Sequence, residues 1–229
     1  MPQALILSGA GRYADPWHPF ADTSARLADL AQQGGWEVVT DQDPDTRLAA
    51  GLDGIDLLIV NTGDPWTNND DDATGPKPEL IEQGRTGLAR AFQRGISVLG
   101  IHTAAASLRD YPQFRAALGG EWVRGRSWHP LFGQVTVRPL HDQIVEGLSD
   151  FTVEDERYTD LDIDPSAEPL AWTGDQDQTY ILAWAHQYQA CRIVYSALGH
   201  DTRSYDSKGH RLFLQRALNW LQPRPVFDD

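Results

Sequence analysis

Apolar runs and helix-like patterns alternate along the first half of this chain. Short apolar runs predict strands, whereas apolar residues spaced three and four positions apart predict helices. We expect strands at residues 4–8, 36–40, 56–61 and 97–101, and helices at residues 23–33 and 78–94. Strands that alternate with helices form a parallel sheet, and right-handed crossovers place helices on both of its faces. The first half therefore predicts a doubly wound α/β fold.

The second half is richer in strands. We expect these at residues 134–138, 170–173, 180–186 and 192–197, before a closing helix at 208–221. Because several of these strands follow one another without a helix, some should pair antiparallel and extend the sheet. No linker-like stretch divides the 229 residues, so we expect a single domain over residues 1–229.

A tight turn that carries a histidine follows the strand predicted at residues 97–101. The small residues after it, 103–106, allow a helix to begin close to the strand. In nucleophile elbows such a turn holds a serine or cysteine above the carboxyl edge of the sheet. Here the residue is His102, and an imidazole is better suited to act as a base, an acid or a metal ligand. A purely hydrogen-bonded histidine at a strand end is the alternative.

Three further histidines are predicted to lie near this turn. His18 follows the first strand, and His200 follows the strand at 192–197. Ligands of open α/β sheets bind outside the carboxyl ends of the strands, so we expect both to share a cleft with His102. His129 ends a segment rich in glycine, arginine and aromatic residues, and we expect it to line the same cleft.

The acidic segment 153–158 offers a carboxylate for the site. Among its three acids we select Glu156 as a general base or metal ligand, provided that one of them points inward. The predicted catalytic residues are then His102, Glu156 and His200. Cys191 lies inside a strand-like run, where a thiol is a packing residue rather than a nucleophile, so we expect it to be dispensable for ligand binding.

Aromatic residues near the strand ends are candidates for substrate binding. Tryptophan offers a flat apolar face to the C–H face of a sugar ring, although each could equally be a hydrophobic anchor. Trp66 lies in a long acidic loop at 62–78, which we expect to be a lid over the site. The predicted substrate-binding residues are Trp17, His18, Trp66, Trp128, His129 and Tyr158.

Two motifs match binding sequences in letters but lack the required context. Residues 9–14 spell a dinucleotide fingerprint, yet Pro16 and Pro19 keep a helix from opening there, so we expect no nucleotide cofactor. Residues 68–75 resemble the start of a calcium loop with Gly75 at its sixth position, but the twelfth position, counted from Asp70, is Ile81 rather than glutamate. We interpret the latter segment as a solvated loop, with metal binding as a minor alternative.

The charge of the chain limits its partners and its compartment. A formal net charge of -14 repels nucleic acids and anionic membrane surfaces, so a small neutral or cationic substrate fits better. The sequence shows neither an apolar signal region nor a run long enough to span a bilayer, from which we expect a cytoplasmic protein.

Short pieces in a fixed order along most of the chain carry a resemblance to a known family. They are Gly100-Ile101-His102, Gly119-Gly120 before His129, His141-Asp142-Gln143-Ile144 with Gly147-Leu148, Asp155-Glu156-Arg157-Tyr158, and Leu198-Gly199-His200. Together they resemble the trehalose-utilization (ThuA-like) family of the class I glutamine-amidotransferase-like superfamily. One departure is Asp142, where the family often has proline.

The resemblance implies a flavodoxin-like sheet and a role in carbohydrate metabolism, on trehalose, related disaccharides or their oxidised forms. It also implies that His102 occupies the nucleophile position of the amidotransferases, so that glutamine hydrolysis through a cysteine thioester is not expected.

Three functional hypotheses follow. The first is an enzyme that acts on a sugar, a disaccharide or a keto-sugar by histidine and carboxylate acid-base chemistry, as a hydrolase, lyase or isomerase. If it is metal-assisted, we expect zinc or a similar divalent ion on two or more of the histidines with Glu156. The second is a non-catalytic sugar-binding or regulatory domain. The third is an assembly subunit whose exposed sheet edge pairs with another chain; a homo-oligomer is one such assembly.

Overall fold

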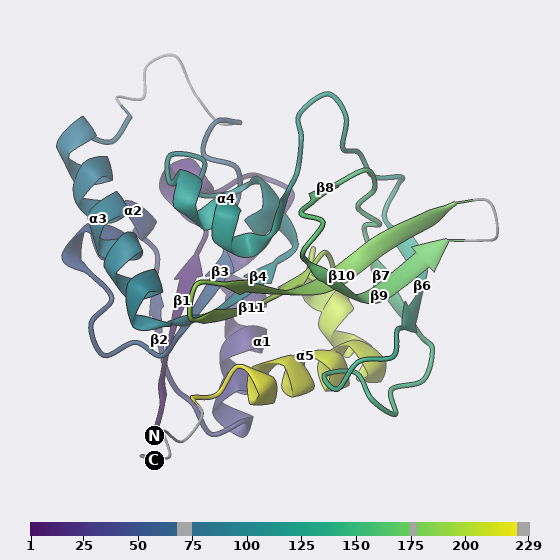
Figure 1. Ribbon diagram of the computed structural model, residues 1–229. Helices are drawn as coiled ribbons and strands as arrows, with labels where there is room; N and C mark the ends of the chain where they lie inside the picture. Colours follow the sequence, from purple (N-terminus) through teal and green to yellow (C-terminus); the bar gives the residue numbers. More distant parts are fainter. Residues whose placement is uncertain (68–74, 175–177, 224–229) are drawn as a thin grey trace.

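The parallel half of the main sheet is built around β1 (Gln3–Ser8) (Figure 1). The computed structural model describes residues 1–67, 75–174 and 178–223. β1 pairs in parallel with β2 (Glu37–Asp41) and β3 (Leu57–Asn61), β4 (Ser97–Ile101) pairs with β3, and β11 (Cys191–Ser196) pairs with β4. The order β2-β1-β3-β4-β11 is that of flavodoxin-like folds, which confirms the predicted fold class.

The second half of the chain extends this sheet with antiparallel strands, as predicted. β10 (Thr179–Tyr188) pairs with β11 and with β9 (Glu168–Gly174), and β6 (Gly133–Pro139) pairs with β9 and with β7 (Phe151–Asp155). The extension continues the order as β10-β9-β6-β7. A short separate pair joins β5 (Gly120–Glu121) to β8 (Asp162–Ile163).

Helices cover both faces of the parallel half (Figure 1). α1 (Phe20–Gln33) and α5 (Lys208–Trp220) lie on one face, whereas α2 (Pro44–Ala50), α3 (Pro78–Arg94) and α4 (Pro112–Leu118) lie on the other. With both faces covered, β3 and β4 are buried along their whole length. This explains why these strands are continuous apolar runs rather than alternating patterns.

Most predicted elements agree with the structure, with three differences. α3 and β4 have the predicted bounds, but α1 begins at Phe20, three residues earlier than expected. α2, α4, β5, β7 and β8 were not predicted; at α2, Asp43 caps the helix by accepting from the amide of Thr46 at 3.2 Å. The helix expected directly after β4 is instead the short 3₁₀ turn η2 (His102–Ala106), and α4 follows later.

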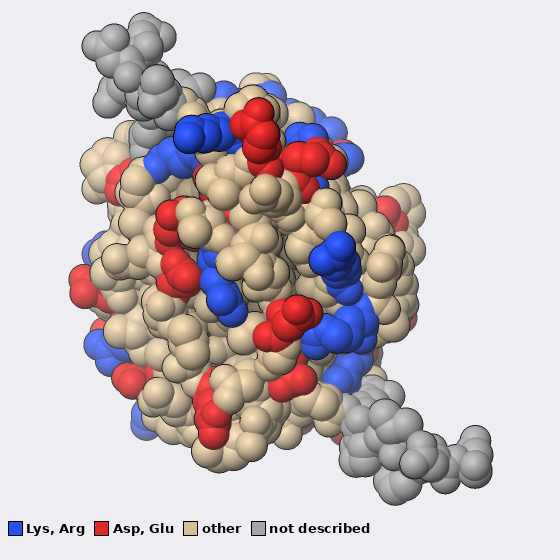
Figure 2. All heavy atoms as spheres, turned by 90° about the vertical axis from the view of Figure 1, so that its left-hand side faces the viewer, with Lys and Arg blue, Asp and Glu red and all other residues tan. Residues whose placement is uncertain are grey.

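Two features can be compared with the partners expected from the sequence: the charge of the surface and the apolar character of the helices. Figure 2 shows acidic and basic side chains interspersed on the face that carries α3, despite the large net negative charge. Among the residues that the structure describes, no helix combines the length and the apolar character needed to cross a membrane.

Candidate functional site

His102 lies at a strained turn between β4 and η2. Its φ angle is 46°, in the left-handed region that residues other than glycine rarely adopt. Two hydrogen bonds from the neighbouring strand β11 and the residue after it hold it there: Tyr195 Oη donates to the carbonyl of His102 at 2.8 Å, and His102 Nδ1 lies 2.6 Å from the carbonyl of Ala197. The turn is therefore an elbow, with an imidazole in place of a nucleophile.

The hydrogen bond to Ala197 fixes the tautomer of this imidazole. A carbonyl oxygen only accepts, so Nδ1 carries the proton and Nε2 presents its lone pair. The side chain is 1% exposed, and burial lowers the pKa of His102 to about 4. His102 is thus neutral near pH 7, with Nε2 free to accept a proton or to bind a cation.

His18 reaches the same place from the end of β1. After β1 the chain forms the 3₁₀ turn η1 (Gly11–Tyr13) and does not open a helix at the glycines. Asp15 then orients His18, because its carboxylate oxygens lie 2.7 and 2.8 Å from His18 Nδ1. The contact with His18 outweighs burial and lowers the pKa of Asp15. His18 Nε2, the other ring nitrogen, is buried without a hydrogen-bond partner among the described residues.

Glu156 stands between His102 and His200. Its Oε1 lies 3.2 Å from His200 Nε2, and its Oε2 lies 3.5 Å from His102 Nε2. Burial raises the pKa of Glu156, but the hydrogen bond from His200 outweighs burial and holds this pKa well below its usual range. The pKa of His200 is raised in turn, since the contact with Glu156 outweighs desolvation. Glu156 is therefore a carboxylate, and His200 is its hydrogen-bond donor.

The rings of the three histidines pack against one another. The ring centroid of His18 lies 5.2 Å from that of His102 and 4.6 Å from that of His200, and the last two are 5.4 Å apart. His129 is more peripheral: its side chain is 38% exposed, with Nδ1 3.4 Å from Glu156 Oε1. The structure thus brings together the four histidines that the sequence placed in one cleft, around the selected carboxylate.

The predicted aromatic residues fall into two groups. Tyr158 is buried and packs on His102, with 4.1 Å between ring centroids. Trp17 and Trp128 are 61% and 47% exposed, each beside a site histidine in the sequence, and Trp128 Nε1 donates to Asp160 at 2.8 Å. Both indoles are therefore largely exposed to solvent, unlike Tyr158.

Trp66 lies behind the elbow. It contributes, with Ala104 and Ala105 of η2, to a cavity of about 210 Å³. Asp64 accepts hydrogen bonds from Arg109 and Arg124, both at 2.9 Å, so the described start of the predicted lid is anchored. Residues 68–74, which include most of the calcium-like motif, lie outside the described residues.

Two carboxylates that the sequence analysis did not select position the site. Asp155 is fully buried and accepts from the amides of Gly199 at 2.8 Å, of His200 at 3.3 Å and of Glu156 at 2.8 Å. It joins the end of β7 to the loop after β11. Asp15 is the second; its position three residues before His18 was a usable signal.

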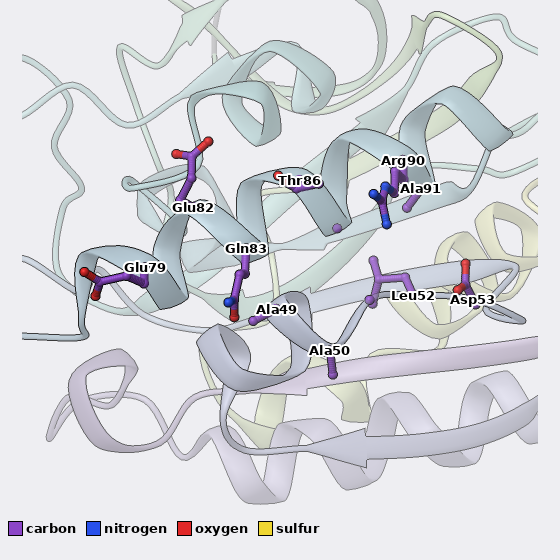
Figure 3. A pocket seen from close by; sticks show the side chains of 12 residues that line it. Ala49, Ala50, Leu52, Asp53, Glu79, Glu82, Gln83, Thr86, Arg90 and Ala91 are labelled. Carbon is purple, nitrogen blue, oxygen red and sulfur yellow. The ribbon is translucent and has the colours of Figure 1, made fainter.

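A cavity of about 520 Å³ lies elsewhere, between α2 and α3 (Figure 3). The side chains that line it include Ala49, Ala50, Leu52, Glu82 and Arg90. None of the predicted site residues lines it, so we place the chemistry at the histidine cluster rather than here.

Cys191 has the properties of a packing residue, as expected. It is fully buried on β11, its thiol donates to the carbonyl of Phe92 at 3.1 Å, and burial raises its pKa to about 11. Such a thiol is a poor nucleophile at neutral pH.

Fold and elbow together define the class of protein: an amidotransferase-like α/β fold with histidine at the elbow. The structure of a GMP synthase component from Thermoplasma acidophilum is similar, with a TM-score of 0.56 and 16% identity, over 96% of this chain and 94% of that one. More specifically, a family model described as trehalose utilisation (ThuA) matches residues 3–221, and the chain belongs to this family.

Two solved ThuA-like proteins have the same fold. The one from Parabacteroides merdae has a TM-score of 0.74 at 16% identity, over 99% of this chain and 94% of that one. The one from Bacteroides uniformis has a TM-score of 0.68 at 15% identity, over 96% and 91% of the two chains. No curated protein matches the chain.

Proposed function

We propose that this chain is an enzyme of carbohydrate metabolism that acts on a sugar, a disaccharide or a keto-sugar by acid-base chemistry. The observation that carries the proposal is the cluster of His18, His102 and His200 at the ends of separate strands, with Glu156 in contact with the last two. The family model carries the description trehalose utilisation, and this supports a sugar as the substrate class.

The residues have complementary roles in this proposal. His102 Nε2 carries a lone pair and accepts a proton from a sugar hydroxyl or from a carbon next to a carbonyl. His200, whose pKa is raised, donates a proton, and Glu156 holds the positive charge between the two rings. Proton removal and return of this kind serve isomerisation, elimination and hydrolysis alike. Glutamine hydrolysis through a thioester has no support, because the elbow carries no cysteine and Cys191 is buried.

A thermal-shift screen of disaccharides and keto-sugars tests the substrate class, since a ligand that binds only the native state raises the unfolding temperature. Stabilising sugars are then incubated with the protein, and the products are separated by chromatography. His102→Ala should abolish turnover while sugar affinity changes only a few-fold, and His141→Ala, at an exposed histidine, should have no effect. If no sugar shifts the unfolding temperature, the proposal is wrong.

The same screen separates the enzyme from a non-catalytic sugar-binding domain. A sugar that stabilises the wild-type protein but is recovered unchanged after incubation would favour the binding domain. A homo-oligomer through the sheet edge makes a separate prediction, a molecular mass above that of one chain in solution.

A further inference from the structure

The histidine cluster has more hydrogen-bond acceptors than donors. His18 Nδ1 donates a hydrogen bond to the carboxylate of Asp15, and His102 Nδ1 donates one to the carbonyl of Ala197. Both rings therefore present a lone pair on Nε2. Both Nε2 atoms are buried and lack a hydrogen-bond partner among the described residues. The carboxylate of Glu156 adds further lone pairs, and His200 Nε2 supplies one donor at 3.2 Å.

A buried group of lone pairs is unfavourable unless a positive charge lies among them. Unpaired buried acceptors lose the hydrogen bonds that water would give them, and a carboxylate next to an imidazole lone pair adds repulsion. His102 Nε2 and Glu156 Oε2 are 3.5 Å apart, too far for a good hydrogen bond. A cation bound between such atoms removes both costs.

The positions of the ligand atoms suit a single ion. One ligand atom each from His18, Glu156 and His200 lies within 4.8 Å of the other two, a spacing that a small side-chain shift closes around an ion with bonds of about 2.0–2.2 Å. Asp15 on His18 Nδ1 is the carboxylate partner that metal-binding histidines commonly have.

From these observations we propose that His18, Glu156 and His200 bind one divalent transition-metal ion, zinc or a similar ion, with His102 Nε2 facing its remaining coordination position. Two imidazoles and one carboxylate are a ligand set that leaves room for water or a substrate oxygen. When His200 binds the ion its imidazole is neutral, so the ion replaces the acidic proton of His200 and takes over its role by polarising a sugar carbonyl or hydroxyl. The inference thus deepens the proposed function and rests on it for its substrate.

Metal binding by the full-length protein tests the site. The chain is freed of metal with a chelator, and Zn²⁺ is titrated calorimetrically; Co²⁺ is added in parallel because its visible absorption reports coordination by histidine. We expect one equivalent of each metal. His18→Ala and Glu156→Gln should each weaken binding by tenfold to a hundredfold or more.

Controls separate this site from adventitious binding. His141→Ala removes an exposed histidine outside the cluster and should retain one equivalent with affinity within a few-fold of wild type. His102→Ala should retain the ion but change the Co²⁺ spectrum. Circular dichroism establishes that each variant is folded, and the nearly isosteric Glu156→Gln provides the decisive result if His18→Ala does not fold.

The outcomes distinguish this inference from the proposed function. If the metal-free protein takes up neither ion, or if folded Glu156→Gln binds as tightly as wild type, the metal site is wrong. The proposed function would survive that result provided the metal-free protein still bound and converted a sugar. Conversely, the wild type could bind one equivalent of metal that Glu156→Gln does not bind, while no sugar binds to either protein. That result would support the metal site and contradict a sugar substrate.

Discussion

The parallel and antiparallel halves of the sheet contribute to the site in different ways. In the parallel half, strands running in one direction bring His18, His102 and His200 to the same edge, as the topology requires. The antiparallel half contributes Glu156 from the end of β7, the outermost strand in the order. β7 reaches the site because it packs against α5 and the 3₁₀ turn η3 (Thr202–Asp206), next to His200.

This difference shows that the histidines lie together because of the fold class, whereas the carboxylate joins them through particular tertiary contacts. The strand order brings the histidines to one edge of the sheet, where local hydrogen bonds orient them, whereas Glu156 depends on Asp155, which bonds the end of β7 to the loop after β11. Variants that detach β7 should therefore damage the carboxylate side of the site and spare the elbow.

The largest effect is expected from Asp155→Ala. The change leaves three backbone amides, at Glu156, Gly199 and His200, without their acceptor, and each unsatisfied buried group costs about 1–3 kcal/mol. We expect a loss of about 3 kcal/mol or more in the free energy of unfolding, measured by urea denaturation. Glu154→Ala, at the exposed neighbour on β7, should change it by about 0.5 kcal/mol or less. Equal effects of the two changes would show that Asp155 does not join the halves.

Gly209→Ala tests the packing of β7 against α5. A Cβ at residue 209 would lie 2.2 Å from Cγ of Phe151, at the start of β7. Alanine normally favours a helix by about 1 kcal/mol over glycine, but here the clash should reverse the sign and destabilise the protein by about 1–3 kcal/mol. Thermal unfolding checks the sign; a stabilised variant would mean that Phe151 moves aside freely.

Stability should also fall below pH 6.5, through buried neutral histidines. Burial lowers the pKa of His210 on α5 to about 4, so between pH 6.5 and 4 the unfolded chain binds a proton that the folded chain does not. Stability from this group is complete above pH 6.5 and declines by about 1.4 kcal/mol per pH unit below it. His102 acts in the same direction. Below pH 6, Asp155 opposes them, because burial raises its pKa to about 6.

The measurement is urea denaturation of wild type and His210→Gln between about pH 7 and pH 5, the range in which an unperturbed histidine takes up its proton. The variant should show the smaller decline, because it lacks one of the groups that titrate. If the two proteins lose stability in parallel, His210 does not contribute to the pH dependence.

The smallest effect on the free energy of unfolding is expected at Trp66, which lies near the turn η2 on the parallel half. If its indole stacks on a sugar, Trp66→Ala should weaken sugar affinity by about 1–3 kcal/mol with little change in the free energy of unfolding. Calorimetric titration with a sugar from the screen measures the first quantity. Val39→Ala, at an exposed apolar residue on β2, is the control. Lost stability with unchanged affinity would make Trp66 only an anchor for its loop.

The sequence predicted the parallel half closely because its signals are local. Gly95 ends α3 in a left-handed conformation, and the apolar run of β4 is bounded on both sides. It predicted less of the antiparallel half. Glu156 was selected from its neighbours, but β7 was not predicted, and the bonds of Asp155 span 44 and 45 residues. Such contacts leave no periodic pattern in the sequence.

The hydrogen bond from His102 Nδ1 to the carbonyl of Ala197 fixes which ring nitrogen carries the proton, and a mutation at residue 197 would not change this. Every amino acid at position 197 supplies the same carbonyl, so changing that side chain leaves the hydrogen-bond acceptor in place. An attempt to redesign this pocket for another reaction would have little to gain from residue 197 and should begin with residue 102 itself.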